Sequence, residues 1–449
     1  MRNERISIIG LGKLGSAMVA AFVSRGFNVI GVDVINEVAE KVNKGIAPVS
    51  ETGLDDLLKQ NKNQISATTD HEGAVCNTDV SFVIVPTPSD PDGGFSIQYA
   101  RHAMREIGTA LKKKGSWHLV VMTSTVLPGS CRNGLITELE KTSGLKCGDG
   151  FGFCYSPEFI ALGSVLHDFL NPDFNLVGEW DVRSGDLLEA IYEQTVLNGA
   201  KCQRMSLENA ELAKVSLNSF VTMKIAFANV IADICQTMEG GDVDAVTEAI
   251  GLDKRIGLKY LKGGMSFGGP CFPRDNKAFA FLADQMEAGS HLAKATDQLN
   301  NEWIEKTVES ICSQCEPHSN ISILGLAYKP ESVVLEDSPS IAIAQKLVDL
   351  GYRVSGYDPI AGAQSRSIVS NRFIIHDTVE DTITNANFVL IATPDEEFKR
   401  LTQKSFDVCN PQCVVMDAWR ILEWDISNQC STRYFPLGVY TPNFRQDIN

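Results

Sequence analysis

One cysteine of the chain lies in a stretch rich in glycine and proline that runs from Gly263 to Asp275. Glycine lets a backbone approach a ligand closely, and these glycines and prolines exclude a long helix, so the stretch predicts a shaped loop. Arg274 and Asp275 follow Cys271 three and four residues on. A thiol beside a cation and a carboxylate has the composition of a nucleophile with an acid/base partner. The alternative is a turn that holds a buried structural cysteine.

A second chemical motif lies at the start of the chain, where the glycine turn Gly10-Leu11-Gly12-Lys13-Leu14-Gly15 follows an apolar strand at 6–9. A helix at 16–24, a second strand at 28–32 and then Asp33 complete the pattern of a dinucleotide-binding unit. Asp33 can accept hydrogen bonds from ribose hydroxyls and would repel a 2′-phosphate, which favours NAD over NADP. The alternative is a doubly wound fold without a nucleotide.

Polar residues follow three further predicted strands, at the ends where open α/β sheets bind ligands. Strand 80–85 leads into Pro86-Thr87-Pro88, and strand 119–122 leads into Thr123-Ser124-Thr125. Strand 151–155 leads into Ser156-Pro157-Glu158. The alternative for Glu158 is an ordinary acidic residue in the first turn of a helix, without a role in ligand binding.

A helical pattern without proline or glycine covers about 208–238, much longer than an average helix. One stripe of it carries polar residues at helical spacing, so it is either a solvated face or the wall of a polar pocket: Glu211, Lys214, Asn218, Thr222 and Asn229. The segment 253–262 that leads to the cysteine loop holds four cations and suits a diphosphate or a carboxylate.

Strands at 321–324, 354–357, 388–392 and 414–416, with a helix at 340–350, predict a second open α/β sheet. The predicted fold class is therefore α/β, with two Rossmann-like doubly wound domains joined by a long central helix. We expect domain boundaries near 205 and 315, with the cysteine loop in the middle segment at 206–315.

Composition narrows the class of protein. A formal charge of −16 over 449 residues argues against nucleic acid or an anionic membrane as partner. The N-terminus lacks the pattern of a signal peptide, and the apolar runs look too short to span a bilayer, so we expect a cytoplasmic protein. The 12 cysteines are scattered, as in a reduced compartment. Cys312 and Cys315, and likewise Cys409 and Cys413, lack further ligands at metal-binding spacing, so no metal site is expected.

Taken together, these motifs resemble the UDP-glucose/GDP-mannose dehydrogenase family along essentially the whole chain. The resemblance rests on the glycine turn and on the following segments in this order: Pro86-Thr87-Pro88, Ser124-Thr125-Val126, Ser156-Pro157-Glu158-Phe159, Glu211 to Lys214, Arg255-Ile256-Gly257, Phe267 to Asp275, Gly325 to Lys329 and Tyr357-Asp358-Pro359. It implies that two NAD molecules in succession oxidise the C6 alcohol of a nucleotide sugar to a carboxylate. The Ser156 and Arg255 segments look more like the UDP-glucose branch.

The resemblance also implies an NAD-binding domain at 1–205, a central helical and dimerisation domain at 206–315 and a nucleotide-sugar-binding domain at 316–449. It further implies the roles of individual residues. Cys271 would carry a thiohemiacetal and then a thioester, while Lys214 and Asn218 hold the C6 oxygen. Asp275 and Lys214 would position a water, in a network that includes Thr125 and Glu158. The implied cofactor contacts are Gly10, Leu11, Gly12, Lys13, Leu14, Gly15, Asp33, Pro86, Thr87, Pro88, Ser124 and Thr125. The implied substrate contacts are Glu158, Phe159, Ile160, Lys214, Asn218, Arg255, Tyr260, Lys262, Phe267, Gly268, Tyr328, Lys329 and Arg420, with Arg255 crossing to the partner of a homodimer.

Two positions depart from the family pattern. Leu162 stands where a glutamate is usual, and Glu336 stands where an arginine is usual before Ser338-Pro339. Both positions normally lie near NAD or the catalytic water, so they bear on cofactor binding. The alternatives are GDP-mannose or another nucleotide hexose as substrate, a two-electron NAD-dependent alcohol dehydrogenase, and a catalytically silent nucleotide-sugar-binding paralogue. The number of NADH formed per sugar separates three cases: two for a 6-dehydrogenase, one for a two-electron alcohol dehydrogenase and none for a silent paralogue.

Overall fold

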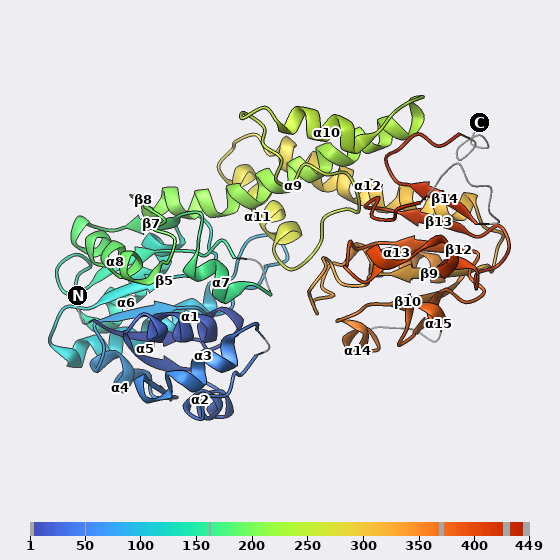
Figure 1. Cartoon of the computed structure of the whole chain (residues 1–449). Coiled ribbons are helices and arrows are strands. Elements are labelled where there is room, and N and C mark those ends of the chain that lie inside the picture. Colours follow the sequence, from blue (N-terminus) through green and yellow to red (C-terminus); the bar gives the residue numbers. More distant parts are fainter. Residues whose placement is uncertain (1–3, 50, 161–162, 368–371, 425–431, 443–449) are drawn as a thin grey trace. The chain divides into compact units, whose positions relative to one another are not determined.

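The computed structural model describes residues 4–442 except 50, 161–162, 368–371 and 425–431 (Figure 1). The chain divides into two compact units, 1–216 and 217–449. Each unit contains one sheet covered by helices, so the predicted α/β class with two open sheets is confirmed.

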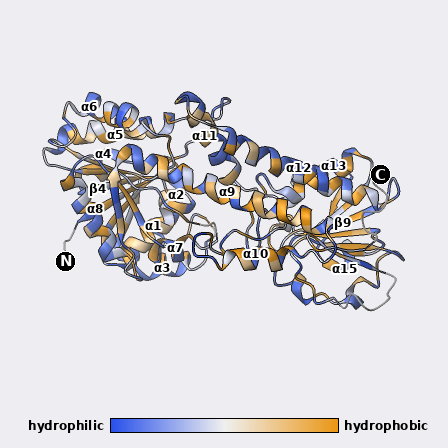
Figure 2. Ribbon diagram, turned by 90° about the horizontal axis from the view of Figure 1, so that it is seen from above, coloured by the Kyte–Doolittle hydropathy of each residue, from blue (hydrophilic) through white to orange (hydrophobic). Residues whose placement is uncertain are grey.

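The first unit is built on an eight-stranded sheet with the order β3-β2-β1-β4-β5-β6-β7-β8. Its first six strands have the order typical of dinucleotide-binding sheets, and all neighbouring pairs are parallel except β6 and β7. Most of the strands are apolar (Figure 2) and buried, as expected for a sheet covered on both faces, whereas the edge strand β8 is polar and partly exposed. Their bounds are β1 Arg5–Ile9, β2 Asn28–Val32, β3 Ile65–Thr68, β4 Val80–Val83, β5 Leu119–Met122, β6 Gly152–Tyr155, β7 Asn175–Glu179 and β8 Cys202–Ser206.

The helices of this unit bury one apolar face against the sheet. On α5, for example, Ala100, Met104, Ile107 and Leu111 are buried at spacings of three and four, while the last turn carries three lysines. The helices are α1 Lys13–Ser24, α2 Asn36–Asn43, α3 Leu54–Gln60, α4 His71–Cys76, α5 Gln98–Lys114, α6 Thr137–Ser143, α7 Val165–Leu170 and α8 Val182–Thr195, with a π-helix, η2, at Ser130–Ile136.

Helix α9, Leu207–Thr237, has 31 residues and contains the boundary between the two units. Its length and its mean hydropathy of 1.4 over 18 residues would suffice for a membrane span, so the expectation that no segment is long and apolar enough was wrong. Nevertheless, the five polar residues of the predicted stripe are all buried, which excludes the alternative of a solvated face. A helix that buries a glutamate, a lysine and two asparagines packs that face against the rest of the folded chain.

The second unit contains a six-stranded parallel sheet with the order β11-β10-β9-β12-β13-β14. This order repeats that of the first six strands of the other sheet. The strands are β9 Asn320–Leu324, β10 Arg353–Tyr357, β11 Phe373–Ile375, β12 Phe388–Ile391, β13 Val414–Asp417 and β14 Arg433–Pro436. The helices are α10 Val243–Gly251, α11 Phe272–Gln285, α12 His291–Ser313, α13 Pro339–Asp349, α14 Gly362–Ser365 and α15 Val379–Ile383, with short 3₁₀ turns at Phe398–Arg400 and Gln403–Phe406.

The last residues of the cysteine stretch, predicted as a loop, belong to a helix in the structure. Cys271 is the N-cap residue of α11, and Phe272 to Asp275 form the first turn of that helix. The proline at 273 does not prevent this, because the first turn of a helix needs no backbone N–H donor at that position.

Candidate functional site

The glycine turn after β1 has the geometry of a phosphate cradle. Gly10 has φ 99°, and a Cβ there would lie 2.0 Å from the carbonyl oxygen of Ile84. A Cβ on Gly15 would lie 1.8 Å from the carbonyl oxygen of Gly10, so these two glycines are required by packing. A Cβ on Gly12, by contrast, would meet no atom within 4 Å. The open space at Gly12, beside the N-terminus of α1, fits the pyrophosphate of a dinucleotide.

Asp33 follows β2 next to this turn. Its two carboxylate oxygens accept hydrogen bonds from the backbone N–H groups of Leu11 (2.8 Å) and Ile35 (2.9 Å). Each oxygen keeps a second lone pair for a further donor. The structure therefore brings Asp33 to the glycine turn with acceptor capacity left for ribose hydroxyls, while Lys13 and Leu14 form the start of α1.

The segments after β4 and β5 are held side by side. The Ser124 hydroxyl accepts from the backbone N–H of Val85 (2.9 Å) and donates to its carbonyl (2.6 Å). The Thr87 hydroxyl, between Pro86 and Pro88, donates to the carbonyl of Thr125 (2.8 Å). The predicted cofactor residues of both strand ends thus share one edge of the sheet.

Glu158 lies in a partly apolar environment that disfavours its charge. Burial raises the pKa of this carboxyl to about 7, against the opposing attraction of Lys214 and a hydrogen bond from Tyr192. Tyr192 also hydrogen-bonds Ser156 (2.7 Å between hydroxyl oxygens). The Lys214 ammonium donates to the backbone carbonyl of Glu158 (2.6 Å) and lies 4.6 Å from the ring centroid of Phe159. The structure therefore brings together Glu158, Phe159 and Lys214, and adds Tyr192, which sequence reasoning missed.

The neighbouring predicted residue Ile160 is half-buried and packs against the apolar core of this unit. Leu162, the first departure from the family pattern, lies outside the described residues. Glu336, the second departure, is exposed.

Glu211 on α9 has a structural task that the sequence did not reveal. Its buried carboxylate accepts from the backbone N–H groups of Gly129 (2.7 Å) and Cys131 (2.8 Å), at the start of η2. Carboxylates at helix N-termini satisfy donors that have no partner inside the helix. Glu211 thereby fixes the segment that follows Thr125.

In the second unit, a buried polar cluster lies next to the cysteine. The Asn218 amide donates to the Asp275 carboxylate (2.6 Å), and both side chains are buried. The Arg274 guanidinium pairs with the other carboxylate oxygen of Asp275 (2.9 Å). Cys271 is exposed, and its carbonyl accepts from the backbone N–H of Asp275 (2.8 Å). The predicted cysteine, asparagine and aspartate are thus assembled around the N-terminus of α11.

Amide side chains and an indole clamp the loop that leads to Cys271. The Asn300 side chain accepts from the backbone N–H of Phe267 (2.8 Å) and donates to its carbonyl (3.0 Å). The Asn229 side chain accepts from the backbone N–H of Gly264 (2.9 Å). The indole N–H of Trp303 donates to the carbonyl of Gly264 (2.7 Å). Asn300 and Trp303 were missed, because a polar and an aromatic residue on an amphipathic helix carry no distinguishing sequence signal.

Aromatic residues surround the same loop. A Cβ on Gly269, whose φ is 83°, would lie 2.5 Å from the ring of Tyr328, so the loop backbone packs directly on that ring. Tyr260 contacts Phe272 edge-on, with 6.0 Å between ring centroids. Burial, together with neighbouring Cys271 and Tyr260, raises the pKa of Tyr328 to about 12. Tyr260, Cys271 and Tyr328, which are predicted site residues from distant segments, therefore lie close together.

The remaining predicted substrate residues differ in their surroundings. Phe267 is buried, and Gly268 passes close to Asp337, whose carbonyl would lie 2.1 Å from a Cβ. Lys329 is half-buried, with its ammonium 5.9 Å from the Tyr328 ring. Lys262 is exposed.

Arg255 and Arg420, two predicted substrate residues of the second unit, differ in their exposure to solvent. Arg255 is 87% exposed and pairs with Asp253 of its own turn (2.6 Å). Arg420 is 7% exposed, and its five N–H groups are directed at Asp244 and at three backbone carbonyls. Contact of either residue with a substrate stays a prediction, and for Arg420 it would require an exchange of these bonds.

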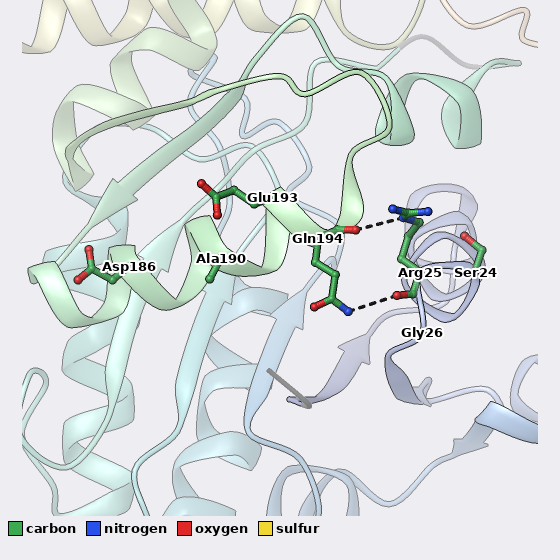
Figure 3. Close-up of a pocket in the computed structure, with 7 residues that line it drawn as sticks. All are labelled: Ser24, Arg25, Gly26, Asp186, Ala190, Glu193 and Gln194. Carbon is green, nitrogen blue, oxygen red and sulfur yellow. Dashed lines mark hydrogen bonds between the residues drawn. The ribbon is translucent and has the colours of Figure 1, made fainter. Parts of the chain in front are cut away.

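A pocket elsewhere in the first unit lies between the C-terminal end of α1 and helix α8 (Figure 3). Arg25 and Gln194 exchange hydrogen bonds across it, from the Arg25 guanidinium to the Gln194 carbonyl (3.1 Å) and from the Gln194 amide to the Arg25 carbonyl (3.2 Å). The glycine turn lies at the opposite end of α1, so this pocket is separate from the cofactor cradle. Among the described residues, no group of three or more His, Cys, Asp or Glu side chains has the geometry to hold a metal ion.

These features define a dinucleotide-dependent enzyme of the α/β class, with a nucleotide cradle on one sheet and a cysteine at a helix N-terminus. Comparison with known proteins extends this. Residues 4–196, 208–302 and 322–424 match, in order, the NAD-binding, central and UDP-binding domains of the UDP-glucose/GDP-mannose dehydrogenase family. The chain belongs to this family of NAD-dependent nucleotide-sugar dehydrogenases.

Relatives with different substrates are equally similar. The chain is 32% identical to a GDP-mannose 6-dehydrogenase of Pseudomonas putida, over 88% of this chain and 92% of the relative. It is also 32% identical to a UDP-glucose 6-dehydrogenase of Haloferax volcanii, over 93% of this chain and 97% of the relative. The solved UDP-glucose dehydrogenase of Pyrobaculum islandicum superposes with a TM-score of 0.87 at 30% identity, with 98% of both chains covered.

Proposed function

We propose that this protein oxidises the C6 alcohol of UDP-glucose to the carboxylate of UDP-glucuronate, through a covalent intermediate on Cys271. The observation that carries the proposal is the placement of Cys271 at the N-cap of α11, above the buried pair of Asn218 and Asp275. The net reaction consumes one alcohol, two NAD⁺ and one water, and yields one carboxylate, two NADH and three protons. The glycine turn and Asp33 would hold NAD, which would supply the hydride acceptor for each of the two oxidations.

The chain's own residues divide the remaining work. Lys214 and Asn218 stabilise negative charge on the C6 oxygen during the first oxidation. The Cys271 thiolate then adds to the aldehyde carbon, which keeps the aldehyde bound as a thiohemiacetal. The second oxidation leaves a thioester, and a water activated by Asp275 releases the carboxylate and returns the thiol. The positive end of α11 favours the thiolate as nucleophile and as leaving group.

Glu158 and Thr125 are proposed members of the water network. A carboxyl with a pKa of about 7 can both give and take a proton near neutral pH, as a group in an acid/base network must. The hydrogen bond that the Thr87 hydroxyl donates to the carbonyl of Thr125 fixes the backbone at Thr125.

The test is a panel of nucleotide sugars with NADH counted per sugar consumed and the product mass measured. We expect two NADH per UDP-glucose and a uronate product. The similarity to GDP-mannose 6-dehydrogenases makes GDP-mannose the second candidate, and a clear preference for it would correct the substrate while keeping the reaction. One NADH per sugar would contradict the covalent four-electron mechanism, and none would indicate a silent binding protein.

Two substitutions test Cys271 directly. Cys271→Ala removes the nucleophile and should abolish net acid formation, while Cys271→Ser should accumulate an ester whose sugar nucleotide adds to the protein mass. Substrate binding should be nearly unchanged in both. Cys76→Ala in the first unit is the matched control, because that thiol only donates to the carbonyl of Ala110. Uronate formation by Cys271→Ala near the parental rate would refute the covalent mechanism.

We further propose a homodimer formed through the central domain. Phe220, Phe227 and Ile234 lie at spacings of seven on α9, and each is more than half exposed. Positions seven apart share one face of a helix, so the three side chains form an apolar stripe suited to a second copy of the same helix. The exposed Arg255 would reach the substrate of the partner. The three functional segments (1–205, 206–315 and 316–449) and a cytoplasmic location complete the proposal.

A further inference from the structure

A buried amide on α11 follows Asp275 directly and bonds to α9. Asn276 is fully buried, and its side-chain oxygen accepts from the hydroxyls of Ser219 (3.0 Å) and Thr222 (3.4 Å). Asn218 and Ser219 are consecutive on α9, as Asp275 and Asn276 are on α11. Two adjacent pairs of side chains therefore link the two helices. Successive residues of a helix point about 100° apart, so two such pairs fix the rotation of α11 about its axis as well as its position.

The other side of the same amide bonds to α12. The Asn276 nitrogen donates to the carboxylate of Asp297 (2.8 Å) and to the backbone carbonyl of Ala293 (2.9 Å). An amide side chain has two N–H donors and one oxygen with two lone pairs, so all of its hydrogen-bonding positions are in use. A hydrogen bond to a carboxylate is also stronger than one between neutral groups. Asn276 thus holds α11 to both α9 and α12 at one buried point.

The position of this amide along α11 links it to the chemistry. Cys271 is the N-cap residue of α11, and Asp275 lies in its first turn. The loop before Cys271 is itself held, since the Asn300 side chain bonds both backbone groups of Phe267. Asp275 lies four residues further on, where its place depends on α11 and on the side chains that contact its carboxylate. Loss of the Asn276 bonds should therefore displace the Asp275 carboxylate more than the Cys271 sulfur.

We propose that Asn276 is a positioning residue for the hydrolysis step, because it holds the Asp275 carboxylate where it activates the water that attacks the thioester on Cys271. This inference rests on the proposed function. Asn276 has no hydrogen-bonding position left for a substrate, so it acts through Asp275. Without its bonds, release of the acid should slow more than formation of the thioester, and the covalent intermediate should accumulate during turnover.

The test measures turnover and the covalent intermediate together in the full-length protein. Asn276→Ala is supplied with saturating NAD and UDP-glucose, quenched in acid during steady-state turnover, and its intact mass is measured. We expect kcat to fall roughly 10- to 100-fold, as for a catalytic group misplaced by about 1 Å. The KM for UDP-glucose should be no higher than in the parent, because the slowed step follows substrate binding. A larger fraction of the protein than in the parent should carry the added mass of the sugar nucleotide.

Further variants separate positioning from folding. Ser219→Ala removes one bond to Asn276 from α9 and leaves α11 unchanged, so it provides the test even if Asn276→Ala does not fold. It should also accumulate the intermediate, whereas Ser219→Thr, which keeps the hydroxyl, should resemble the parent. Ser322→Ala is the matched control, since the buried Ser322 hydroxyl donates to the carbonyl of Thr382 (2.6 Å) in the same unit. It should lower stability but show parental kcat and no excess of added mass.

The outcomes distinguish this inference from the proposed function. Cys271→Ala combined with Asn276→Ala should carry no added mass, which assigns the adduct to that cysteine. Parental kcat in Asn276→Ala and Ser219→Ala, or a loss of kcat without accumulation of the intermediate, would overturn the role of Asn276. Accumulation in Ser322→Ala would overturn it too, because general loosening of the unit would then suffice. A parent that forms no uronate from any nucleotide sugar would instead refute the proposed function, and with it the hydrolysis step.

Discussion

Glu158 offers a quantitative test of the electrostatics in the first unit. Burial raises its pKa from an ordinary 4.5 to about 7, despite Lys214 and Tyr192, which both act to lower it. At about 1.4 kcal/mol per pH unit, this difference corresponds to about 3 kcal/mol between the protonated and ionised forms. Since the side chain is only half-buried, solvent screening makes about 3 kcal/mol an upper limit.

The sign of the pH dependence follows from which state binds more protons. Between pH 4.5 and about 7 the folded protein keeps the Glu158 proton while the unfolded chain has lost it, so the free energy of unfolding falls as pH rises. The stabilisation is fully present below pH 4.5 and is lost above about pH 7. Glu158→Gln carries no titrating proton, so its stability lacks this component.

The assay is urea unfolding of the parent and of Glu158→Gln across pH 4.5 to 8. The parent should lose up to about 3 kcal/mol relative to the variant over this range. Glu138→Gln is the matched control, because Arg105 and Arg101 lower the pKa of Glu138 to about 2 and its contribution changes only below pH 4.5. A difference between parent and Glu158→Gln that is flat, or that favours the parent as pH rises, would refute the assignment.

Three further predictions follow from single contacts. Asp33→Asn should raise kcat/KM with NADP relative to NAD, measured by NADH and NADPH absorbance, and a parent that already uses both equally would contradict the role of this carboxylate. Phe227→Asp places a charge in the apolar stripe of α9 and should shift the proposed dimer to monomer in sedimentation velocity, whereas a dimer of unchanged stability would contradict an interface at this stripe. Asn218→Ala removes the bond to buried Asp275 and should lower the free energy of unfolding by about 1.5–3 kcal/mol, and a loss below about 0.5 kcal/mol would show that this bond contributes little.

The sequence predicted the sheets better than the loops around them. Buried parallel strands are continuous apolar runs, so β1, β2, β5, β9 and β12 could be recognised within a residue or two. The short helices α2 and α3 and strands β7 and β8 were not anticipated, because their apolar pattern is weak and their position depends on tertiary packing. The whole cysteine stretch was predicted as a loop because Pro273 is a helix breaker in most positions. The structure places Pro273 in the first turn of α11, where proline is tolerated.

Sequence reasoning proposed the candidate site residues whose type is selected by their chemistry, and it missed residues that act through the direction of their polar atoms. Cys271, Asp275 and Lys214 stand out in the sequence because a thiol, a carboxylate and an amine can act as nucleophile and acid/base groups. Asn300 and Trp303 act only through the direction of their polar atoms toward the loop backbone, which no linear pattern encodes.

The two sheets share one strand order, and an aspartate follows the second strand of each, yet the two carboxylates are used differently. Asp358 accepts four backbone N–H groups, two on each oxygen: from Leu326 (2.8 Å) and Ala327 (2.9 Å), and from the first residues after it, 360 (2.9 Å) and 361 (2.6 Å). A carboxylate offers about four lone-pair sites, so Asp358 has none left for a ribose. Asp33 accepts two backbone N–H groups and keeps the other sites open. Hydrogen-bond capacity, rather than topology, therefore assigns the dinucleotide to the first sheet, because only there does the acid after the second strand remain able to bind a ligand.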